Sequence, residues 1–95
     1  MLEKDIERYF VWHIERLGGR TWKFASPHQR GVADRIACLA DGSVWFVELK
    51  RPGGKLSRLQ ELFAADMARL NQNYRCLSSR EQVDDFVKEL SRGRG

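Results

Sequence analysis

The sequence predicts a small α/β domain in which a central mixed β-sheet is flanked by helices, in the order α-β-β-β-α-β-α. Three observations support this fold class. A chain of 95 residues has room for one hydrophobic core. Its composition, 42% hydrophobic and 32% charged, is typical of a folded globular domain. Apolar residues recur with a helical period in three segments and in strand-like runs in four others.

Residues 2–17 are predicted to form an amphipathic helix that ends at Gly18-Gly19. Two neighbouring stripes follow its length. The first consists of Leu2, Ile6, Tyr9, His13 and Leu17, and the second of Glu3, Glu7, Phe10, Ile14 and Leu17. Because the second stripe is apolar after its first two members, Glu3 and Glu7 should lie at the edge of the buried face.

Three short strands are predicted next, and they span residues 21–25, 34–39 and 43–50. The turn Ala40-Asp41-Gly42 joins the second strand to the third, and glycine suits the last position of a three-residue hairpin loop. The apolar run Val44-Trp45-Phe46-Val47 predicts a central strand that is covered on both faces.

This hairpin brings three charged residues together. A three-residue loop pairs Leu39 with Ser43, and the same register places Asp34 opposite Glu48, on one face of the sheet. Lys50 follows two residues after Glu48, so its side chain points to that face as well. Two carboxylates can bind a hard cation such as Mg²⁺, which in turn binds phosphate and activates water. The alternative is a salt-bridged strand end without chemistry.

The rest of the chain is predicted to form a helix, a strand and a last helix. The middle helix runs from a Ser57 cap to about Leu70, the strand spans residues 74–77, and the capping box Ser79-Arg80-Glu81-Gln82 begins the last helix. The expected apolar stripes are Leu59, Leu62, Phe63, Asp66, Met67 and Leu70 in the middle helix, and Val83, Phe86, Val87 and Leu90 in the last. We also expect core positions for Trp12, Trp22, Trp45 and Tyr74. Residues 1–91 should form the single domain, and residues 92–95 a flexible basic tail.

Several protein classes are excluded. No apolar run is long enough to cross a bilayer, which predicts no membrane association, and the N-terminus does not resemble a signal peptide. Cys38 and Cys76 show no CxxC pattern and no ligand spacing with the histidines, so we expect reduced thiols in a cytoplasmic protein and no zinc. The segment Gly53-Gly54-Lys55 lacks the other residues of a phosphate-binding loop, which excludes a nucleotide cofactor.

Basic residues gather around the acidic pair, although the net charge is only +4. Such a distribution is typical of a surface that binds the phosphates of nucleic acid. The residues predicted to bind nucleic acid are Lys23, Arg30 and Arg35 around Asp34, and Arg51, Lys55 and Arg58 after Lys50.

These residues and this order of elements resemble the PD-(D/E)XK nuclease superfamily, and within it the small stand-alone VRR-NUC group of phage and bacterial nucleases. The string from Val47 to Gln60 is the most specific part of the resemblance. The family usually has proline where this chain has Ala33, but proline there shapes the backbone and does no chemistry. The matching residues are Glu3, Lys23, Gly31-Val32-Ala33-Asp34-Arg35, Phe46-Val47-Glu48-Leu49-Lys50-Arg51-Pro52-Gly53-Gly54-Lys55-Leu56-Ser57 and Gln60.

The resemblance implies a restriction-endonuclease-like fold and a Mg²⁺-dependent DNA endonuclease that hydrolyses phosphodiester bonds, with Mn²⁺ able to substitute. Asp34, Glu48 and the backbone carbonyl of Leu49 would bind the metal, and Lys50 would orient or deprotonate the attacking water. Glu3 would support a metal-bound water. Gln60 would help to position Lys50 or the substrate.

Family members of this size resemble homodimeric, structure-selective enzymes that act on branched DNA in replication, repair or recombination. The resemblance therefore implies the cytoplasm of a bacterial or phage-infected cell. The first helix is the expected contact between subunits, because Tyr9, Phe10, Trp12 and Ile14 are spread widely around it.

Some alternatives remain open at the level of sequence. Gln60 is also the fourth residue of a capping box that begins at Ser57, so it could serve the helix alone. Glu7 competes with Glu3 because it lies one turn away on the same side of the helix. The number of metal ions is undetermined, and the whole domain could be a non-catalytic nucleic-acid-binding module that has kept a nuclease-like fold.

Overall fold

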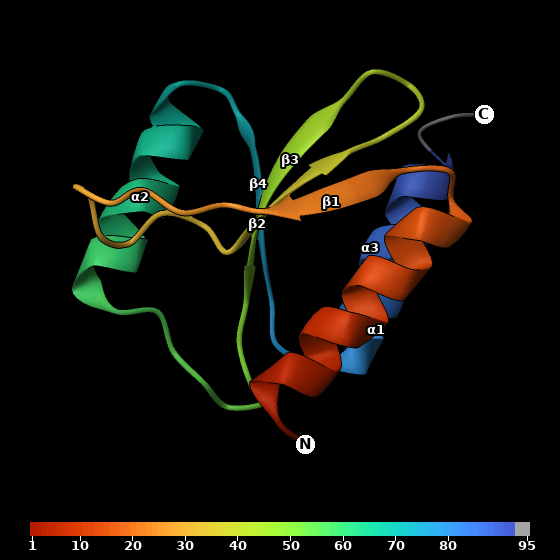
Figure 1. Cartoon of the computed structure of the whole chain (residues 1–95), viewed down its shortest axis with the longest axis horizontal. Helices are drawn as coiled ribbons and strands as arrows, with labels where there is room; N and C mark the ends of the chain where they lie inside the picture. The colour runs from red at the N-terminus through yellow and green to blue at the C-terminus, as the bar shows by residue number, and fades with distance from the viewer. Residues whose placement is uncertain (93–95) are drawn as a thin grey trace.

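The computed structural model, in which residues 1–92 are described, confirms the predicted order of elements (Figure 1). The helices are α1 (Glu3–Arg16), α2 (Arg58–Arg69) and α3 (Arg80–Arg92), and the strands are β1 (Arg20–Lys23), β2 (Arg35–Cys38), β3 (Val44–Leu49) and β4 (Asn73–Leu77). Arg92 is the last residue of α3, so the helix includes the first residue of the predicted tail. The rest of that tail, residues 93–95, lies outside the described residues.

The four strands form one mixed sheet in the order β1-β2-β3-β4. The first three strands pair antiparallel, and β4 pairs parallel to β3. Helix α2 connects β3 to β4 and lies on one side of the sheet, while α1 and α3 lie side by side on the other (Figure 1). The molecule therefore has three layers, with two helices covering one face of the sheet and a single helix covering the opposite face.

The face covered by α1 and α3 contains the main core. Three residues of α1, Ile6, Phe10 and Ile14, are fully buried, and they pack in one cluster with the sheet and α3. The Phe10 and Phe86 rings are stacked at a centroid distance of 6.4 Å. The other buried members of this core are Ala37, Leu39, Val47, Leu49, Leu77, Val83 and Leu90.

The face covered by α2 is packed less completely. An aromatic cluster of Phe24, Phe46, Phe63 and Tyr74 fills it, with neighbouring ring centroids 5.9 to 6.4 Å apart. All four residues are only partly buried, and α2 contains no fully buried residue.

The predicted apolar stripe of α2 is wrong in part. Leu59, Leu62 and Leu70 are 46%, 44% and 49% exposed, whereas Phe63 and Met67 face the sheet and are partly buried. Phe63 belongs to the aromatic cluster on this face of the sheet, so the cluster determines which side of α2 is buried.

Two of the four aromatic residues expected in the core are exposed. Trp12 is 51% and Trp22 48% exposed, while Trp45 and Tyr74 are partly buried. Trp12 lies off the buried stripe of α1, and Trp22 lies on edge strand β1. Each exposed indole contacts an arginine instead, with Arg16 4.6 Å from the Trp12 ring and Arg20 5.2 Å from the Trp22 ring.

Helix α1 exposes less apolar surface for a contact between subunits than its sequence suggests. Phe10 and Ile14 are fully buried inside the domain, and Tyr9 donates a hydrogen bond of 2.6 Å to Asp84 of α3. Of the four residues on which the expectation rested, only Trp12 is broadly exposed.

Both cysteines are free thiols, and in residues 1–92 no helix is long and apolar enough to cross a membrane.

Candidate active site

The hairpin between β2 and β3 has the predicted register. The Leu39 amide donates to the Ser43 carbonyl at 2.9 Å, and the strand pairs run from Cys38 opposite Val44 to Arg35 opposite Val47. The next pair in this register is Asp34 opposite Glu48. Strand alternation places both carboxylates on the face covered by α2. The loop geometry that the sequence predicts therefore brings the acidic pair together.

Glu48 is the most unusual residue of this group, because its side chain is charged in its ordinary state and yet is only 2% exposed. One carboxylate oxygen, Oε2, accepts a hydrogen bond from Gln60 Nε2 at 3.2 Å and lies 3.7 Å from Lys50 Nζ. The other oxygen, Oε1, is buried and has no hydrogen-bond partner among residues 1–92. A buried polar atom without a partner is destabilising, so this oxygen is available to a ligand.

The pKa of Glu48 is raised from 4.5 to about 8. Burial is the main cause, followed by the neighbouring Asp34 carboxylate, which favours a proton shared with Glu48 and repels its negative charge. Lys50 acts in the opposite direction and lowers the pKa. The pair is therefore arranged so that two negative charges are unfavourable unless a cation lies between them.

Asp34 is fixed by the backbone of the neighbouring strands. Its Oδ2 accepts a hydrogen bond from the Leu49 amide at 2.9 Å, and its own carbonyl accepts one from the Phe24 amide at 2.9 Å. The first bond links Asp34 to the residue that follows Glu48. The Asp34 carboxylate is thus held by a backbone amide of β3 rather than by a mobile side chain.

Gln60 completes the capping box of α2 and also reaches the acidic pair. The Ser57 amide donates to Gln60 Oε1 at 2.8 Å, and the Gln60 amide donates to Ser57 Oγ at 3.2 Å, which completes the capping box of α2. Because the cap occupies Oε1, the side-chain NH₂ group is directed to Glu48. The same residue therefore caps the helix and binds the buried carboxylate.

A close backbone contact holds the loop before Asp34 against α2. Gly31 has a positive φ of 86°, and a Cβ atom at this position would lie 2.6 Å from the backbone carbon and oxygen of Leu59. Only glycine fits both the conformation and the approach. Ala33 is fully buried in the same loop. This contact brings the segments that carry Asp34 and Gln60 together.

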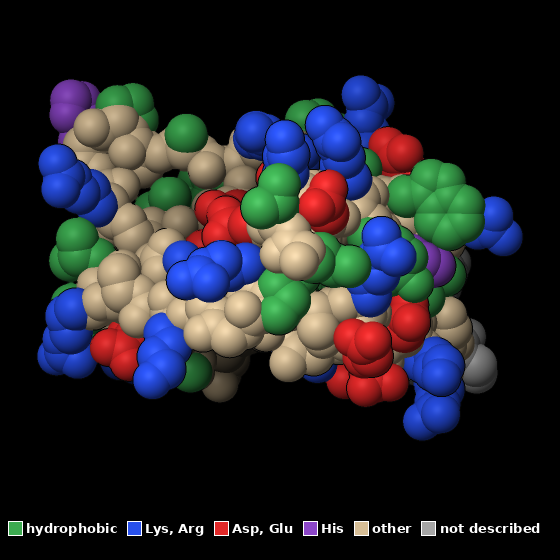
Figure 2. Space-filling model, turned by 90° about the horizontal axis from the view of Figure 1, so that it is seen from below, with side chains coloured by type: hydrophobic (Ala, Val, Ile, Leu, Met, Phe, Trp, Pro, Cys, Tyr) green, Lys and Arg blue, Asp and Glu red, His purple; other side chains and the backbone are tan. Residues whose placement is uncertain are grey.

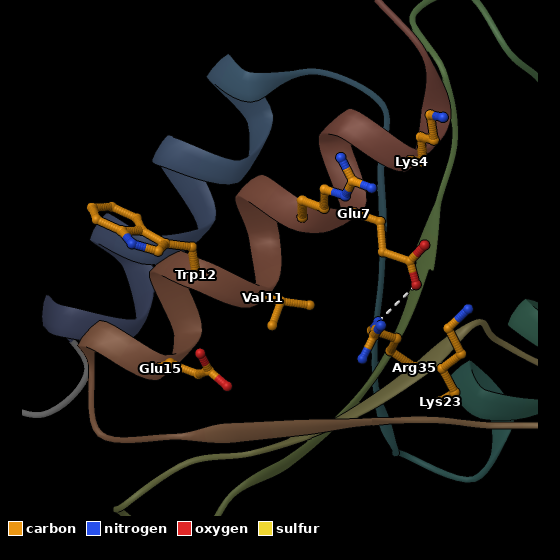
Figure 3. A pocket seen from close by; sticks show the side chains of 8 residues that line it. Lys4, Glu7, Val11, Trp12, Glu15, Lys23 and Arg35 are labelled. Atoms are coloured by element: carbon orange, nitrogen blue, oxygen red, sulfur yellow. Dashed lines mark hydrogen bonds and ion pairs between the residues drawn. The ribbon is translucent and has the colours of Figure 1, made fainter.

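The structure distinguishes Glu3 from Glu7, the two glutamates of α1 that the sequence proposes for the site. Glu7 Oε2 accepts a hydrogen bond of 2.7 Å from Arg35 Nε and so already has a partner, as Figure 3 shows. Glu3 lies close enough to Glu48 to contribute to its raised pKa through charge repulsion. Glu3 is therefore the helix residue whose charge reaches the acidic pair.

The predicted nucleic-acid-binding residues fall into two groups. Lys23 and Arg35 are paired across β1 and β2, on the sheet face opposite to the acidic pair. Arg35 is only 16% exposed in its side chain, and its guanidinium is bound to Glu7 and to Thr21 at 2.9 Å. The remaining four side chains are exposed on the loops and the helix start beside the acidic pair, and they are Arg30, Arg51, Lys55 and Arg58.

Figure 2 views the molecule from below Figure 1 and shows acidic side chains near the middle of this face, with lysine and arginine side chains on several sides. A phosphate group that approached these acidic side chains would pass the surrounding lysine and arginine side chains. The charge distribution therefore supports binding of a polyanion at this end of the sheet.

Within residues 1–92 no group of three or more His, Cys, Asp or Glu side chains is close enough to hold a metal ion. The predicted ligand set needs only two carboxylates, because its third member is the Leu49 carbonyl. The unpartnered Oε1 of Glu48 and the adjacent Asp34 fit a cation that prefers oxygen ligands, such as Mg²⁺. They do not fit a structural zinc site, which uses sulfur and nitrogen ligands.

One neighbour of the site was not found from sequence. Cys76 on β4 is paired with Glu48 on β3, so both side chains face α2. Burial and the charge of Glu48 raise the pKa of its thiol, which is therefore kept protonated. Only the parallel pairing of β4 with β3 reveals this proximity, and the sequence carries no signal for that register.

Comparison with known proteins finds a similar sequence and a similar solved structure. No protein-family model matches the chain. A protein of Acyrthosiphon pisum secondary endosymbiont phage 1, described as "Putative nuclease p44", is 45% identical over 53 residues, which are 56% of this chain and 57% of that protein. The chain thus spans little more than half of that relative. A solved structure described as "VRR_NUC domain" superposes with a TM-score of 0.87 at 26% identity, over 90% of this chain and 94% of that one.

Proposed function

We propose that this chain, which is a VRR_NUC domain by its fold and its motif residues, is a metal-dependent DNA endonuclease. The observation that carries the proposal is the convergence of Asp34, Glu48 and Lys50 at one end of the sheet, with a buried Glu48 oxygen that has no partner in the described part of the chain. A salt-bridged strand end would pair this oxygen. A metal site leaves it free for the cation.

Asp34, Glu48 and the backbone carbonyl of Leu49 would hold Mg²⁺, and Mn²⁺ would substitute because it accepts the same oxygen ligands. When bound, the cation would polarise the phosphate and lower the pKa of a coordinated water. The Leu49 amide holds Asp34 in place, and Gln60 holds Glu48, so the ligands are oriented before the metal arrives.

Lys50 supplies a positively charged hydrogen-bond donor, which a pair of carboxylates lacks. Its ammonium lies beside Glu48 and is largely buried, so it can donate a hydrogen bond to a phosphate oxygen or orient the attacking water. Attack by water opposite the 3′ oxygen breaks the bond between phosphorus and that oxygen. The products are a 5′-phosphate and a 3′-hydroxyl end. Glu3 would bind a second water from the first turn of α1.

The substrate is DNA, which the exposed cations Arg30, Arg51, Lys55 and Arg58 bind through its phosphates. Branched DNA in replication, repair or recombination is the proposed target, and the cytoplasm of a bacterial or phage-infected cell the proposed location. Both rest on the resemblance to the VRR-NUC group.

A homodimer is part of the same proposal, because two-fold symmetry would set two sites against paired strands. Three large apolar side chains are exposed along α2 and its C-cap, namely Leu59, Leu62 and Leu70. Light scattering of the protein at micromolar concentration should therefore show a dimer that Leu62→Glu converts to a monomer. A parent protein that is monomeric and cleaves DNA equally well on dilution would contradict the dimer.

The function is tested by incubating the protein with labelled linear, flapped and four-way DNA in Mg²⁺, in Mn²⁺ and in EDTA. Cleavage should require the metal, favour the branched substrates, and disappear in Glu48→Gln. Glu61→Gln, which changes an exposed glutamate of α2, is the matched control and should cleave normally. DNA binding without cleavage of any substrate in either metal would instead favour the non-catalytic binding module.

A further inference from the structure

A groove with a volume of about 400 Å³ lies between α1 and β1, away from the acidic pair (Figure 3). Six of its lining residues belong to α1, and they are Lys4, Glu7, Arg8, Val11, Trp12 and Glu15. Lys23 of β1 and Arg35 of β2 form the opposite wall. The metal-dependent chemistry proposed above uses none of the space in this groove.

The groove carries an excess of uncompensated positive charge. The negative charge of Glu7 is neutralised by Arg35, at 2.7 Å. Lys4, Arg8 and Lys23 have no acidic partner among residues 1–92, and all three are exposed. Three free cations along one groove attract a chain of phosphates.

The groove also carries an aromatic side chain that the core does not use. Trp12 is 51% exposed, although a residue of its size and apolar character is usually buried. Lys4, Arg8 and Trp12 are spaced four residues apart on α1, so they follow one side of the helix over about 12 Å. Figure 3 shows Trp12 and Glu15 at one end of the groove, and Lys4, Lys23 and Arg35 at the other.

We propose that this groove is a second nucleic-acid site, which binds a short single-stranded segment of the substrate with its phosphates on Lys4, Arg8 and Lys23 and an unpaired base stacked on Trp12. A cationic groove combined with an exposed aromatic ring is the arrangement by which proteins bind single strands. Bases of a duplex are already stacked on one another and cannot reach the indole. Glu15 lies at the tryptophan end, where a base would bind rather than a phosphate.

One end of the groove is at Lys4, which follows Glu3, the residue of α1 whose charge reaches Glu48. A single strand that leaves a duplex at the active site would therefore have a basic path along α1. The inference rests on the proposed function in taking nucleic acid as the partner, but it concerns binding and does not need the metal.

The test measures binding in EDTA, where no metal-dependent cleavage occurs. Anisotropy of a labelled oligodeoxythymidylate and of a blunt duplex would be followed for four variants, Trp12→Ala, Trp12→Phe, Trp22→Ala and a combined Lys4→Ala, Arg8→Ala and Lys23→Ala. Trp22 is the matched control, because it is equally exposed, 48%, and equally stacked on an arginine, but lies outside the groove.

Trp12→Ala should weaken single-strand binding by about 5- to 100-fold, and Trp12→Phe should restore most of it, because stacking needs an aromatic face. Trp22→Ala should change affinity by less than about twofold on the same reasoning, and duplex binding should be unchanged by Trp12→Ala. The triple variant should reduce the salt dependence by about 0.7 in slope for each phosphate that its side chains no longer neutralise.

Equal effects of Trp12→Ala and Trp22→Ala, or no effect of either, would overturn the proposal. So would light scattering in which Trp12→Ala dissociates a dimer, because a second copy would then cover the groove. Single-strand binding that depends on Trp12 in a protein that cleaves no DNA would support this site while the proposed nuclease activity failed. Normal cleavage of every substrate with single-strand affinity independent of Trp12 would reject the site and leave the nuclease.

Discussion

The two faces of the sheet differ in how completely their side chains are buried. On the face covered by α1 and α3, Phe10, Val47 and Phe86 are almost fully buried in a continuous core. On the face covered by α2, Phe46 and Phe63 are only partly buried, and no residue of the helix is fully buried. The closed face supplies stability, and the open face leaves one end of the sheet accessible.

Strand β3 and the residue that follows it contribute side chains alternately to the two faces of the sheet. Val47 and Leu49 point into the closed core, while Glu48 and Lys50 point to the open side. The apolar pair anchors the strand that presents the charged pair. Glu48 is nevertheless as buried as its apolar neighbours, at 2% exposure, so the open face holds its charges in a water-poor position. Electrostatic effects are strongest in such a position.

The largest expected effect belongs to the open face. Lys50→Ala should reduce cleavage by about 10²- to 10⁴-fold, because it removes the positioned group that acts on water or phosphate. Metal binding, measured by calorimetry, should persist because lysine is not a ligand. DNA affinity should fall only modestly, since several other cations contribute.

A combined Arg51→Ala, Lys55→Ala and Arg58→Ala variant is the counterpart of Lys50→Ala. It should lose affinity and show a flatter salt dependence while its carboxylates and lysine stay intact. Equal, modest effects of Lys50→Ala and of each single loop substitution, with a parent protein that does not cleave DNA, would identify a binding module instead.

The second prediction compares aromatic residues of the two faces. Phe86→Ala should lower the free energy of unfolding by about 3–5 kcal/mol, because it leaves a cavity in the closed core. Phe63→Ala, on α2, should lower it clearly less, since its ring is only partly buried and the helix can move. Urea unfolding of both variants measures the difference. Equal losses would show that the α2 face is as tightly packed as the other.

Sequence was sufficient where short-range geometry decides the structure. The three-residue turn Ala40-Asp41-Gly42 fixes the hairpin register, and the register alone predicts that Asp34 faces Glu48. The capping box of α2 was also predicted directly, and the structure adds a hydrogen bond from its Gln60 to Glu48. These features depend on residues close in sequence or related by a fixed count.

Sequence was insufficient where the choice depends on contacts between distant segments. Arg35 looked like a DNA-binding residue, but Glu7, 28 positions away, holds its guanidinium inside the domain. The exposure of Trp12 depends on how α1 is rotated over the sheet. The observed buried face combines Ile6 of the first predicted stripe with Phe10 and Ile14 of the second. Periodicity leaves such a rotation uncertain by about one position.

A third, smaller effect concerns pH. Glu48 has a raised pKa of about 8 when folded, against 4.5 ordinarily, so the folded protein binds an extra proton between these values. The contribution of Glu48 to the free energy of unfolding is therefore fully present below about pH 4.5. It falls, by up to a few kcal/mol, as the pH rises to about 8. Melting temperatures in EDTA should decrease over this window in the parent and much less in Glu48→Gln.

Mg²⁺ should reverse this trend, because a cation favours the ionised carboxylate and stabilises the folded state that binds it. The parent protein should then gain more stability from Mg²⁺ at pH 8 than at pH 5. A metal-free melting temperature that is constant across the window would contradict the assignment of the raised pKa to Glu48. Glu61→Gln should behave like the parent in both buffers.

The smallest expected effect separates the two roles of Gln60, at the point where α2 meets the open face. Ser57→Ala removes only the cap and should lower the free energy of unfolding by about 1 kcal/mol, with cleavage by the folded protein unchanged. Gln60→Ala removes the cap interaction and also the hydrogen bond to Glu48. It should cause a similar loss of stability and, in addition, reduce cleavage about tenfold, because a hydrogen bond to a charged group contributes about 1.5 kcal/mol or more. Urea unfolding and single-turnover cleavage of both variants decide between the roles. If both substitutions lower cleavage by the same factor, Gln60 acts on the site only through the position of α2.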